Sequence, residues 1–247
     1  MPIGIMSALQ DEIQVLLDRM TDVAPTPALG RAFYAGELEG QKIVVVGSGV
    51  GKVRASACAQ YLIDEFHVHN MIMFGLAGAL NNELKIGDIV ISKKAVMYDY
   101  FVAGEGVNEN IRIGPIEADP QLVEIALLAT QYVAPRSGGH LGIVLTGDAA
   151  VADAGRRAAL RREFGGDCVE MEGAAVALVC SMNRVPFVIV RAISDLADEH
   201  AHTQFEEAFK HASDRSTDVV LEMLRMISRP DAADPVEGAA DSRAYPR

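Results

Sequence analysis

The chain has 247 residues, of which 50% are hydrophobic and 23% charged, with a formal net charge of -12. This composition provides for a sizeable core and excludes global disorder, and the length suits one large α/β domain or two small ones. The negative charge argues against a nucleic-acid partner, which would need a basic surface, and against an anionic membrane surface. The absence of any apolar run of roughly 18 residues argues against a membrane span.

The chain start and the cysteines indicate a compartment. Residues 1–5 lack the basic region of a signal peptide and are predicted to enter a strand directly. Cys58, Cys168 and Cys180 show neither a CxxC nor a Cys–His spacing, so buried free thiols are expected. We therefore expect a cytoplasmic, reduced protein that needs no metal and no cofactor.

The first elements are a short strand and an amphipathic helix. Residues 2–6 are predicted to form a buried strand, and Ser7 to cap a helix over residues 10–20. Glu12 lies in the first turn of that helix. Taken alone, Glu12 is better explained as a surface carboxylate that complements the helix dipole than as a functional residue.

A glycine-rich sequence follows the next strands. Residues 33–46 are predicted to form a β-hairpin, which leads through Gly47-Ser48-Gly49-Val50-Gly51-Lys52 into a helix over residues 55–66. This sequence has neither the GxxxxGK[ST] spacing of a phosphate loop nor the GxGxxG spacing of a dinucleotide site. It indicates a tight strand-to-helix turn in which the backbone can approach a small ligand.

The middle of the chain continues the alternation of strands and helices. A continuous apolar run over residues 70–74 predicts a strand that is covered on both faces, with a small-residue turn at 75–79. Another strand is expected over residues 86–98. Residues 99–118 are predicted to form a long loop, and loops of this length in compact domains tend to be functional or interfacial.

In addition to the helix and the strand of residues 173–195 described below, three further helices are predicted after residue 118, with a strand between the first two. They are predicted over residues 120–132 (helix), 140–145 (strand), 153–163 (helix) and 203–227 (helix). Because strands alternate with helices and no linker precedes residue 228, we expect one α/β domain over residues 1–228 with a largely parallel sheet. Residues 229–247 are rich in Ala, Asp, Pro and Gly and are predicted to be disordered.

Charged residues gather at successive element ends late in the chain. Glu170 and Glu172 precede a small-residue helix, and an apolar strand then leads to Arg191, Ser194 and Asp195 at its carboxyl end. Ligand sites form at this end of strands in parallel α/β sheets. Buried charges cost free energy unless they are paired or used. These residues are therefore either structural ion pairs or parts of a site, and we favour the site.

Seven short sequences occur in order between residues 2 and 227: Ile3-Gly4-Ile5 with Glu12, Ser48–Val53, Gly75-x-Ala77-Gly78, Gly87–Val90, Thr146–Ala149, Val169–Glu172 and Arg191–Asp195. Together they resemble the nucleoside phosphorylase/nucleosidase superfamily, and within it the 5'-methylthioadenosine/S-adenosylhomocysteine nucleosidases. The resemblance implies a nucleoside phosphorylase-like α/β fold, a three-layer α/β/α sandwich around a mixed, partly closed sheet. It also implies a homodimer that acts on a small-molecule nucleoside.

The implied reaction is hydrolysis of the N-glycosidic bond of 5'-methylthioadenosine and S-adenosylhomocysteine, with release of adenine. This chemistry needs an acid for the purine, a base for water, and negative charge near an oxocarbenium-like ribose. By resemblance, Asp195 protonates adenine N7, Glu12 activates water and Glu172 holds the ribose hydroxyls. Arg191 orients the water and the acidic residues, and Met171 lines the sugar. Asp195 must then have a raised pKa to carry a proton near neutral pH.

The resemblance assigns the remaining contacts to the main chain and to apolar side chains. Gly78 and Val151 contact the substrate through the main chain, with Val151 reading the adenine edge. Leu9, Val50 and Phe205 form an apolar slot for the 5'-alkylthio group.

Two positions depart from the family pattern. Leu76 stands in a Gly-Leu-Ala-Gly sequence where the family commonly has Gly-Ser-Ala-Gly, so a hydroxyl near the nucleophile is missing. Ala150 stands where the family often has an aromatic that stacks on adenine, a loss worth about 1 kcal/mol. Glu12 would repel phosphate and so favours a hydrolase over a phosphorylase. The alternatives left open are a futalosine-type or other purine-nucleoside hydrolase, a phosphorylase, and a catalytically silent nucleoside-binding protein.

Overall fold

The computed structural model describes residues 1–100, 114–135 and 138–228. The disorder predicted for residues 229–247, and most of the long loop predicted at 99–118, lie outside these residues. None of the helices within them combines the length and the apolar character that crossing a membrane requires. Cys58, Cys168 and Cys180 are buried free thiols, as expected.

The described residues form ten strands and six helices, and strands and helices alternate along much of the chain. In chain order they are β1 Ile3–Ser7, α1 Gln10–Leu17, β2 Thr21–Ala28, β3 Arg31–Leu38, β4 Gln41–Gly47, α2 Lys52–Phe66, β5 Asn70–Ala79, β6 Ile89–Met97, β7 Ile116–Glu117, α3 Pro120–Val133, β8 Gly139–Thr146, α4 Ala154–Phe164, β9 Cys168–Glu170, α5 Gly173–Asn183, β10 Phe187–Asp195 and α6 Ala201–Ser228.

All the strands belong to one sheet, in the order β10-β6-β8-β9-β5-β1-β4-β3-β2, with β7 paired to β6. Because β10 also pairs with β5, the strands β10, β6, β8, β9 and β5 close into a barrel. Parallel pairs such as β1–β5 and β5–β10 occur beside antiparallel pairs such as β3–β4 and β6–β10. The mixed, partly closed sheet is confirmed, and the expectation of a largely parallel sheet is wrong.

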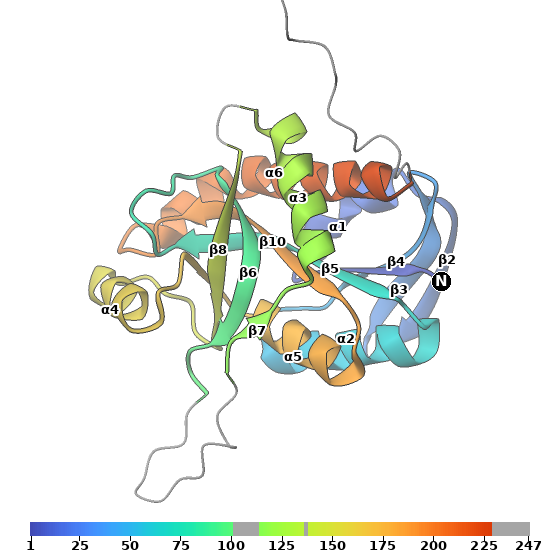
Figure 1. Cartoon of the computed structure of the whole chain (residues 1–247), viewed down its shortest axis with the longest axis horizontal. Helices are drawn as coiled ribbons and strands as arrows, with labels where there is room; N and C mark the ends of the chain where they lie inside the picture. Colours follow the sequence, from blue (N-terminus) through green and yellow to red (C-terminus); the bar gives the residue numbers. More distant parts are fainter. Residues whose placement is uncertain (101–113, 136–137, 229–247) are drawn as a thin grey trace, which may run out of the picture.

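Helices cover both sides of the sheet (Figure 1). One hydrophobic core lies under α1, α3 and α6, and a second lies under α2 and α5. Strand side chains alternate between the two, since Ile3 and Ile5 of β1 belong to the first core and Met6 to the second. These layers confirm the three-layer α/β/α sandwich.

Three strands were not expected, and one is longer than predicted. β7 has only two residues and lies within the segment 99–118, which was predicted to be a loop. The edge strand β2 contains Pro25 and Pro27, residues that argue against a central strand but are accepted at an edge. β9 has only three residues, too few for a periodic pattern. The small-residue turn predicted at 75–79 is wrong, because β5 continues through Ala79. Gly75 and Gly78 of β5 leave space for side chains of the neighbouring strand β10.

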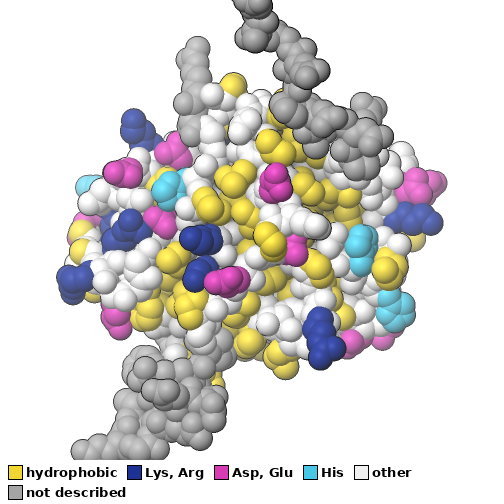
Figure 2. Space-filling model, in the orientation of Figure 1, with side chains coloured by type: hydrophobic (Ala, Val, Ile, Leu, Met, Phe, Trp, Pro, Cys, Tyr) yellow, Lys and Arg dark blue, Asp and Glu magenta, His cyan; other side chains and the backbone are white. Residues whose placement is uncertain are grey.

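Hydrophobic side chains occupy much of the middle of the face seen in Figure 2. Val50, within the glycine-rich turn before α2, and Val53, in the first turn of α2, have 41% and 79% of their surface exposed.

Candidate active site

A cavity of about 350 Å³ lies where the carboxyl ends of β1, β5, β8 and β10 meet. Its size is within the usual range for a small-molecule site. All the residues that the sequence assigned to the site line this cavity, namely Leu9, Glu12, Val50, Gly78, Ala150, Val151, Met171, Glu172, Arg191, Asp195 and Phe205. The fold therefore brings them together, while their individual roles remain predictions.

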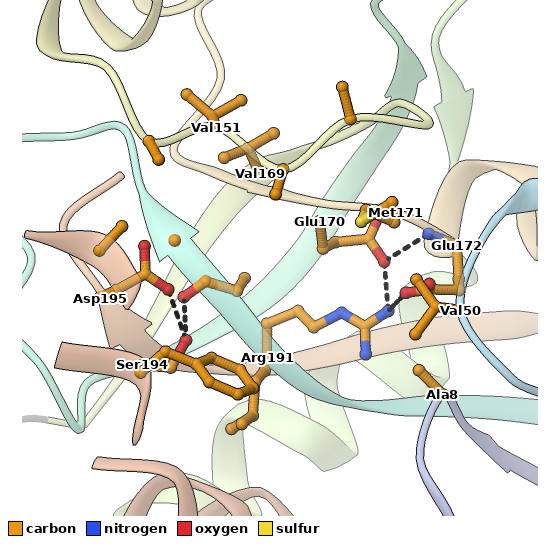
Figure 3. Close-up of a pocket in the computed structure, with 18 of the residues that line it drawn as sticks. Ala8, Val50, Val151, Val169, Glu170, Met171, Glu172, Arg191, Ser194 and Asp195 are labelled. Atoms are coloured by element: carbon orange, nitrogen blue, oxygen red, sulfur yellow. Dashed lines mark hydrogen bonds and ion pairs between the residues drawn. The ribbon is translucent and has the colours of Figure 1, made fainter. Parts of the chain in front are cut away.

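Asp195 ends β10 at one side of the cavity (Figure 3). The β10 strand contains an irregularity between Ile193 and Asp195, of the kind that re-aims side chains at active sites. Ser194 Oγ donates a 2.8 Å hydrogen bond to Asp195 Oδ2, and the Ala197 N–H donates one of 2.9 Å to Oδ1. Burial raises the pKa of Asp195, although both hydrogen bonds oppose this shift.

Two glycines of β5 make space for the charged groups of β10. In the parallel β5–β10 pair, Gly75 lies beside Arg191 and Gly78 beside Asp195. A Cβ on Gly78 would lie 2.7 Å from Asp195 Oδ1, and one on Gly75 would lie 2.8 Å from Arg191 Nη1. Gly75 also has a φ of +137°, which side-chain-bearing residues rarely adopt. The Gly75-x-Ala77-Gly78 motif thus has a steric origin.

Arg191 forms a buried ion-pair cluster at the other side of the cavity (Figure 3). Its Nη2 pairs with Glu170 and lies 3.9 Å from Glu172 Oε2, and its Nη1 donates a 2.7 Å hydrogen bond to the Phe74 carbonyl. Burial and the nearby charge of Glu170 raise the pKa of Glu172 to about 7.

Glu170 and Glu172 have different environments, which the sequence did not separate. Glu170 accepts hydrogen bonds from the Thr146 hydroxyl and from the Gly173 N–H, the latter at 2.7 Å, at the N-terminus of α5. It is thereby fixed as the partner of Arg191. The Glu172 side chain lines the cavity, and its Oε1 accepts a 2.8 Å hydrogen bond from the Gly51 N–H.

Glu12 is buried, with only 2% of its surface exposed, so the view of it as a surface carboxylate is wrong. Ser7 Oγ donates a 2.5 Å hydrogen bond to Glu12 Oε2, and the Leu9 N–H donates one of 2.9 Å to the same oxygen. Ser7 does not cap α1, because Leu9 is the N-cap residue. Burial raises the pKa of Glu12, while these hydrogen bonds and the charge of Arg191 lower it.

The glycine-rich turn before α2 binds carboxylates of the protein itself. The Gly51 N–H donates to Glu172, and the Lys52 N–H donates a 3.0 Å hydrogen bond to Asp148 Oδ1. Lys52 Nζ also lies 2.6 Å from Asp99 Oδ1. The backbone donors that a phosphate loop offers to its ligand are thus already engaged here.

Within the described part of the chain, Phe205 is the one Phe, Tyr or Trp that lines the cavity, and the His202 imidazole lies beside it in the lining. Phe205 packs against Phe209, with ring centroids 5.5 Å apart. Ala150, where the family often has a ring, is exposed. Most lining residues that the sequence did not assign are small or apolar and carry no distinguishing signal, including Ala8, Ala77, Ala149, Ala152, Val169 and Ala201.

The family model of the phosphorylase superfamily matches residues 2–225. A 5'-methylthioadenosine/S-adenosylhomocysteine nucleosidase from Staphylococcus carnosus (strain TM300) is 34% identical over 229 residues, which are 91% of this chain and 100% of the relative. The structure of such a nucleosidase from Colwellia psychrerythraea 34H, in complex with adenine, has a TM-score of 0.85 and 32% identity, covering 91% of this chain and 94% of the other. Futalosine hydrolase of Helicobacter pylori has a TM-score of 0.84 and 29% identity, with coverages of 90% and 97%.

The chain therefore belongs to the phosphorylase superfamily and, within it, to the 5'-methylthioadenosine/S-adenosylhomocysteine nucleosidase family. It is an enzyme of the N-glycosidic hydrolase class.

Proposed function

We propose that the enzyme hydrolyses 5'-methylthioadenosine and S-adenosylhomocysteine, releasing adenine and the corresponding thioribose product. The observation that carries this proposal is the presence of two buried carboxyl groups, Asp195 and Glu12, in different hydrogen-bond environments of one cavity. One acid and one base are what an N-glycosidic hydrolysis requires.

In the proposed step, Asp195 donates its proton to adenine N7 while the electrons of the C1'–N9 bond leave with the purine. Glu12 takes a proton from water, and the water oxygen forms the new bond to C1'. Glu172 holds the ribose hydroxyls, and its negative charge favours the cationic sugar. Arg191 orients the water and the carboxylates. The enzyme ends the cycle with Asp195 ionised and Glu12 protonated, and exchange with solvent restores both.

The other lining residues are proposed to shape the substrate pocket. Met171 lines the sugar, and the main chain of Gly78 and Val151 contacts the substrate, with Val151 at the adenine edge. Leu9, Val50 and Phe205 are proposed to form the 5' slot. Their apolar character suits an alkylthio group, since removing such a group from water is favourable.

Two features support water rather than phosphate as the nucleophile. Glu12 places a carboxylate in the cavity, where it would repel a phosphate dianion. The N–H groups of Gly51 and Lys52 at the start of α2 already bind Glu172 and Asp148.

A futalosine-type nucleoside is the second candidate substrate. Leu76 and Ala150 both line the cavity and both depart from the family pattern, so the two positions can change which nucleoside fits. The likeness to futalosine hydrolase of Helicobacter pylori supports this candidate as well.

The test is release of free base from 5'-methylthioadenosine, S-adenosylhomocysteine, adenosine and futalosine, each with and without phosphate. We expect adenine from the two thio-substrates, at rates that phosphate does not change. Release from futalosine alone would select the second candidate. Activity that requires phosphate would reject a hydrolase mechanism.

We also propose that the chain forms a homodimer. The exposed side chains of Val50, which lines the cavity, and of Val53, three residues further along the chain, are suited to burial against a second copy. Sedimentation equilibrium should give twice the mass of the chain, and a monomer mass at micromolar concentration would reject this proposal.

A further inference from the structure

Ser7 places a hydroxyl against the carboxylate proposed to activate water. Its Oγ lies 2.5 Å from Glu12 Oε2 and 3.0 Å from the Phe74 carbonyl oxygen. It ends β1, which pairs in parallel with β5, and a Cβ on Gly75 would lie 3.1 Å from Ser7 Oγ. The hydroxyl therefore lies against β5 at the residue that precedes Leu76.

We propose that Ser7 is a positioning residue for Glu12, and that it supplies from β1 the hydroxyl that Leu76 does not supply from β5. This inference rests on the proposed function, because it assigns Ser7 to the base of that reaction. It concerns a residue that contacts Glu12 and not the substrate.

The geometry around Glu12 shows how Ser7 acts. The Ser7 hydroxyl and the Leu9 N–H both donate to Oε2, so the carboxylate is held in one orientation and Oε1 is left for the water. The Phe74 carbonyl gives the same hydroxyl a second acceptor, so Ser7 keeps a hydrogen-bond partner after Glu12 has taken a proton. That carbonyl also accepts from Arg191 Nη1, which links the base to the ion-pair cluster.

The hydroxyl also favours the ionised form of Glu12. The side chain is buried, and burial raises the pKa of Glu12 and so favours the protonated form, which cannot accept a proton. The charged groups that face it are Arg191 from β10, which favours ionisation, and Glu172 before α5, which opposes it. A hydrogen bond to an ionised carboxylate changes its protonation equilibrium about tenfold, which shifts the titration midpoint by about one pH unit.

The test compares the pH dependence of kcat for wild type, Ser7→Ala and Ser92→Ala. Ser92 is an equally buried serine whose Oγ accepts a 2.9 Å hydrogen bond from the Ile189 N–H away from the cavity. We expect Ser7→Ala to move the acid limb of kcat upward by about one pH unit and to lower kcat about tenfold at pH values below that limb. The alkaline limb, assigned to Asp195, should stay in place, and Ser92→Ala should move neither limb.

The double variant Ser7→Ala/Leu76→Ser tests whether a hydroxyl from β5 can replace the one from β1. We expect the acid limb of the double variant to return toward that of wild type. An acid limb that is identical in wild type and Ser7→Ala would overturn the inference, even if kcat fell, because a purely structural role lowers kcat without moving the limb.

A second readout separates this inference from the proposed function. Carbon-13 NMR of the Glu12 carboxyl reports its protonation without any substrate. If wild type releases no base from any of the nucleosides, the proposed function fails. The inference that Ser7 controls Glu12 still holds if the Glu12 titration midpoint is higher in Ser7→Ala, and it is rejected if the midpoints agree.

Discussion

The backbone N–H of Gly51 donates a 2.8 Å hydrogen bond to Glu172 Oε1, which joins the turn before α2 to the residue before α5. Glu172 also shares the guanidinium of Arg191 with Glu170, and the charge of Glu12 acts on it as well. One buried cation thus faces three carboxyl groups. Because negative charge is in excess and Glu172 is buried, the ionised form of Glu172 lowers the free energy of unfolding of the protein.

The variant Glu172→Gln should therefore be more stable than wild type at alkaline pH. Burial and Glu170 raise the pKa of Glu172 from its ordinary 4.5 to about 7, so the folded state favours the protonated form. Protonation of Glu172 therefore stabilises the folded state. This contribution to the free energy of unfolding is complete below pH 4.5 and is lost as the pH rises through about 7. At pH 8 we expect the free energy of unfolding of the variant to exceed that of wild type by about 1 to 3 kcal/mol.

Urea unfolding at pH 5, 6, 7 and 8 measures this difference, with Glu65→Gln, an exposed change on α2, as the control. The advantage of Glu172→Gln should grow as the pH rises. A variant that is less stable than wild type at every pH would show that the Gly51 and Arg191 contacts outweigh the repulsion. Turnover should fall in either case, because a neutral amide stabilises the cationic sugar less well.

Asp195→Asn should lower kcat by at least about 100-fold, because an amide cannot donate a proton to the purine. The fold should persist, since the Asn amide oxygen can still accept from the Ala197 N–H, and the amide nitrogen, in the place of Oδ2, can donate to Ser194 Oγ. Circular dichroism and calorimetric binding of a transition-state mimic check the fold and the pocket. Unchanged turnover would reject the role of Asp195 as the acid.

The pH profile offers a companion test of the same carboxyl group. Burial raises the pKa of Asp195, and activity should disappear as the pH rises through that value, because the acid is then ionised. Ser194→Ala removes a hydrogen bond that favours the ionised form, so the alkaline limb should move to higher pH. A downward shift would contradict this assignment.

The sequence predicted the alternation of elements well because buried strands and amphipathic helices leave periodic patterns. It failed at β2, β7 and β9, where an edge position or a length of two or three residues removes the pattern. The assigned site residues share a cavity because carboxyl-end positions of neighbouring strands must converge.

The partners of the charged groups were beyond the sequence, for a physical reason. Whether Glu12 is a surface group or a buried base depends on Ser7 and on β5, which are placed by strand pairing and not by local pattern. Which of Glu170 and Glu172 is the fixed partner of Arg191 depends likewise on which of them accepts from the Thr146 hydroxyl.

Gly78→Ala should impair catalysis with little effect on folding. The added Cβ would lie 2.7 Å from Asp195 Oδ1, which must then move. A displacement of about 1 Å can cost about 100-fold in rate. Gly114→Ala is the matched control, because a Cβ there would meet none of the residues that the structure describes within 4 Å. Equal kcat values for the two variants would show that Asp195 does not act from its position beside Gly78.

Ala150→Phe should tighten the binding of adenine. Ala150 is exposed at the wall of the cavity, and Tyr98 holds the turn before it through a 3.1 Å hydrogen bond to the Ala149 carbonyl. A ring on this supported turn would give the purine a stacking surface worth about 1 kcal/mol, or roughly a fivefold lower Kd. Ala150→Leu adds apolar area without a ring, so the two variants separate stacking from simple burial. Calorimetry with adenine should show a clear gain for Phe and a smaller one for Leu. Equal gains would mean that burial alone accounts for the effect, and no gain in either would show that residue 150 does not face the base.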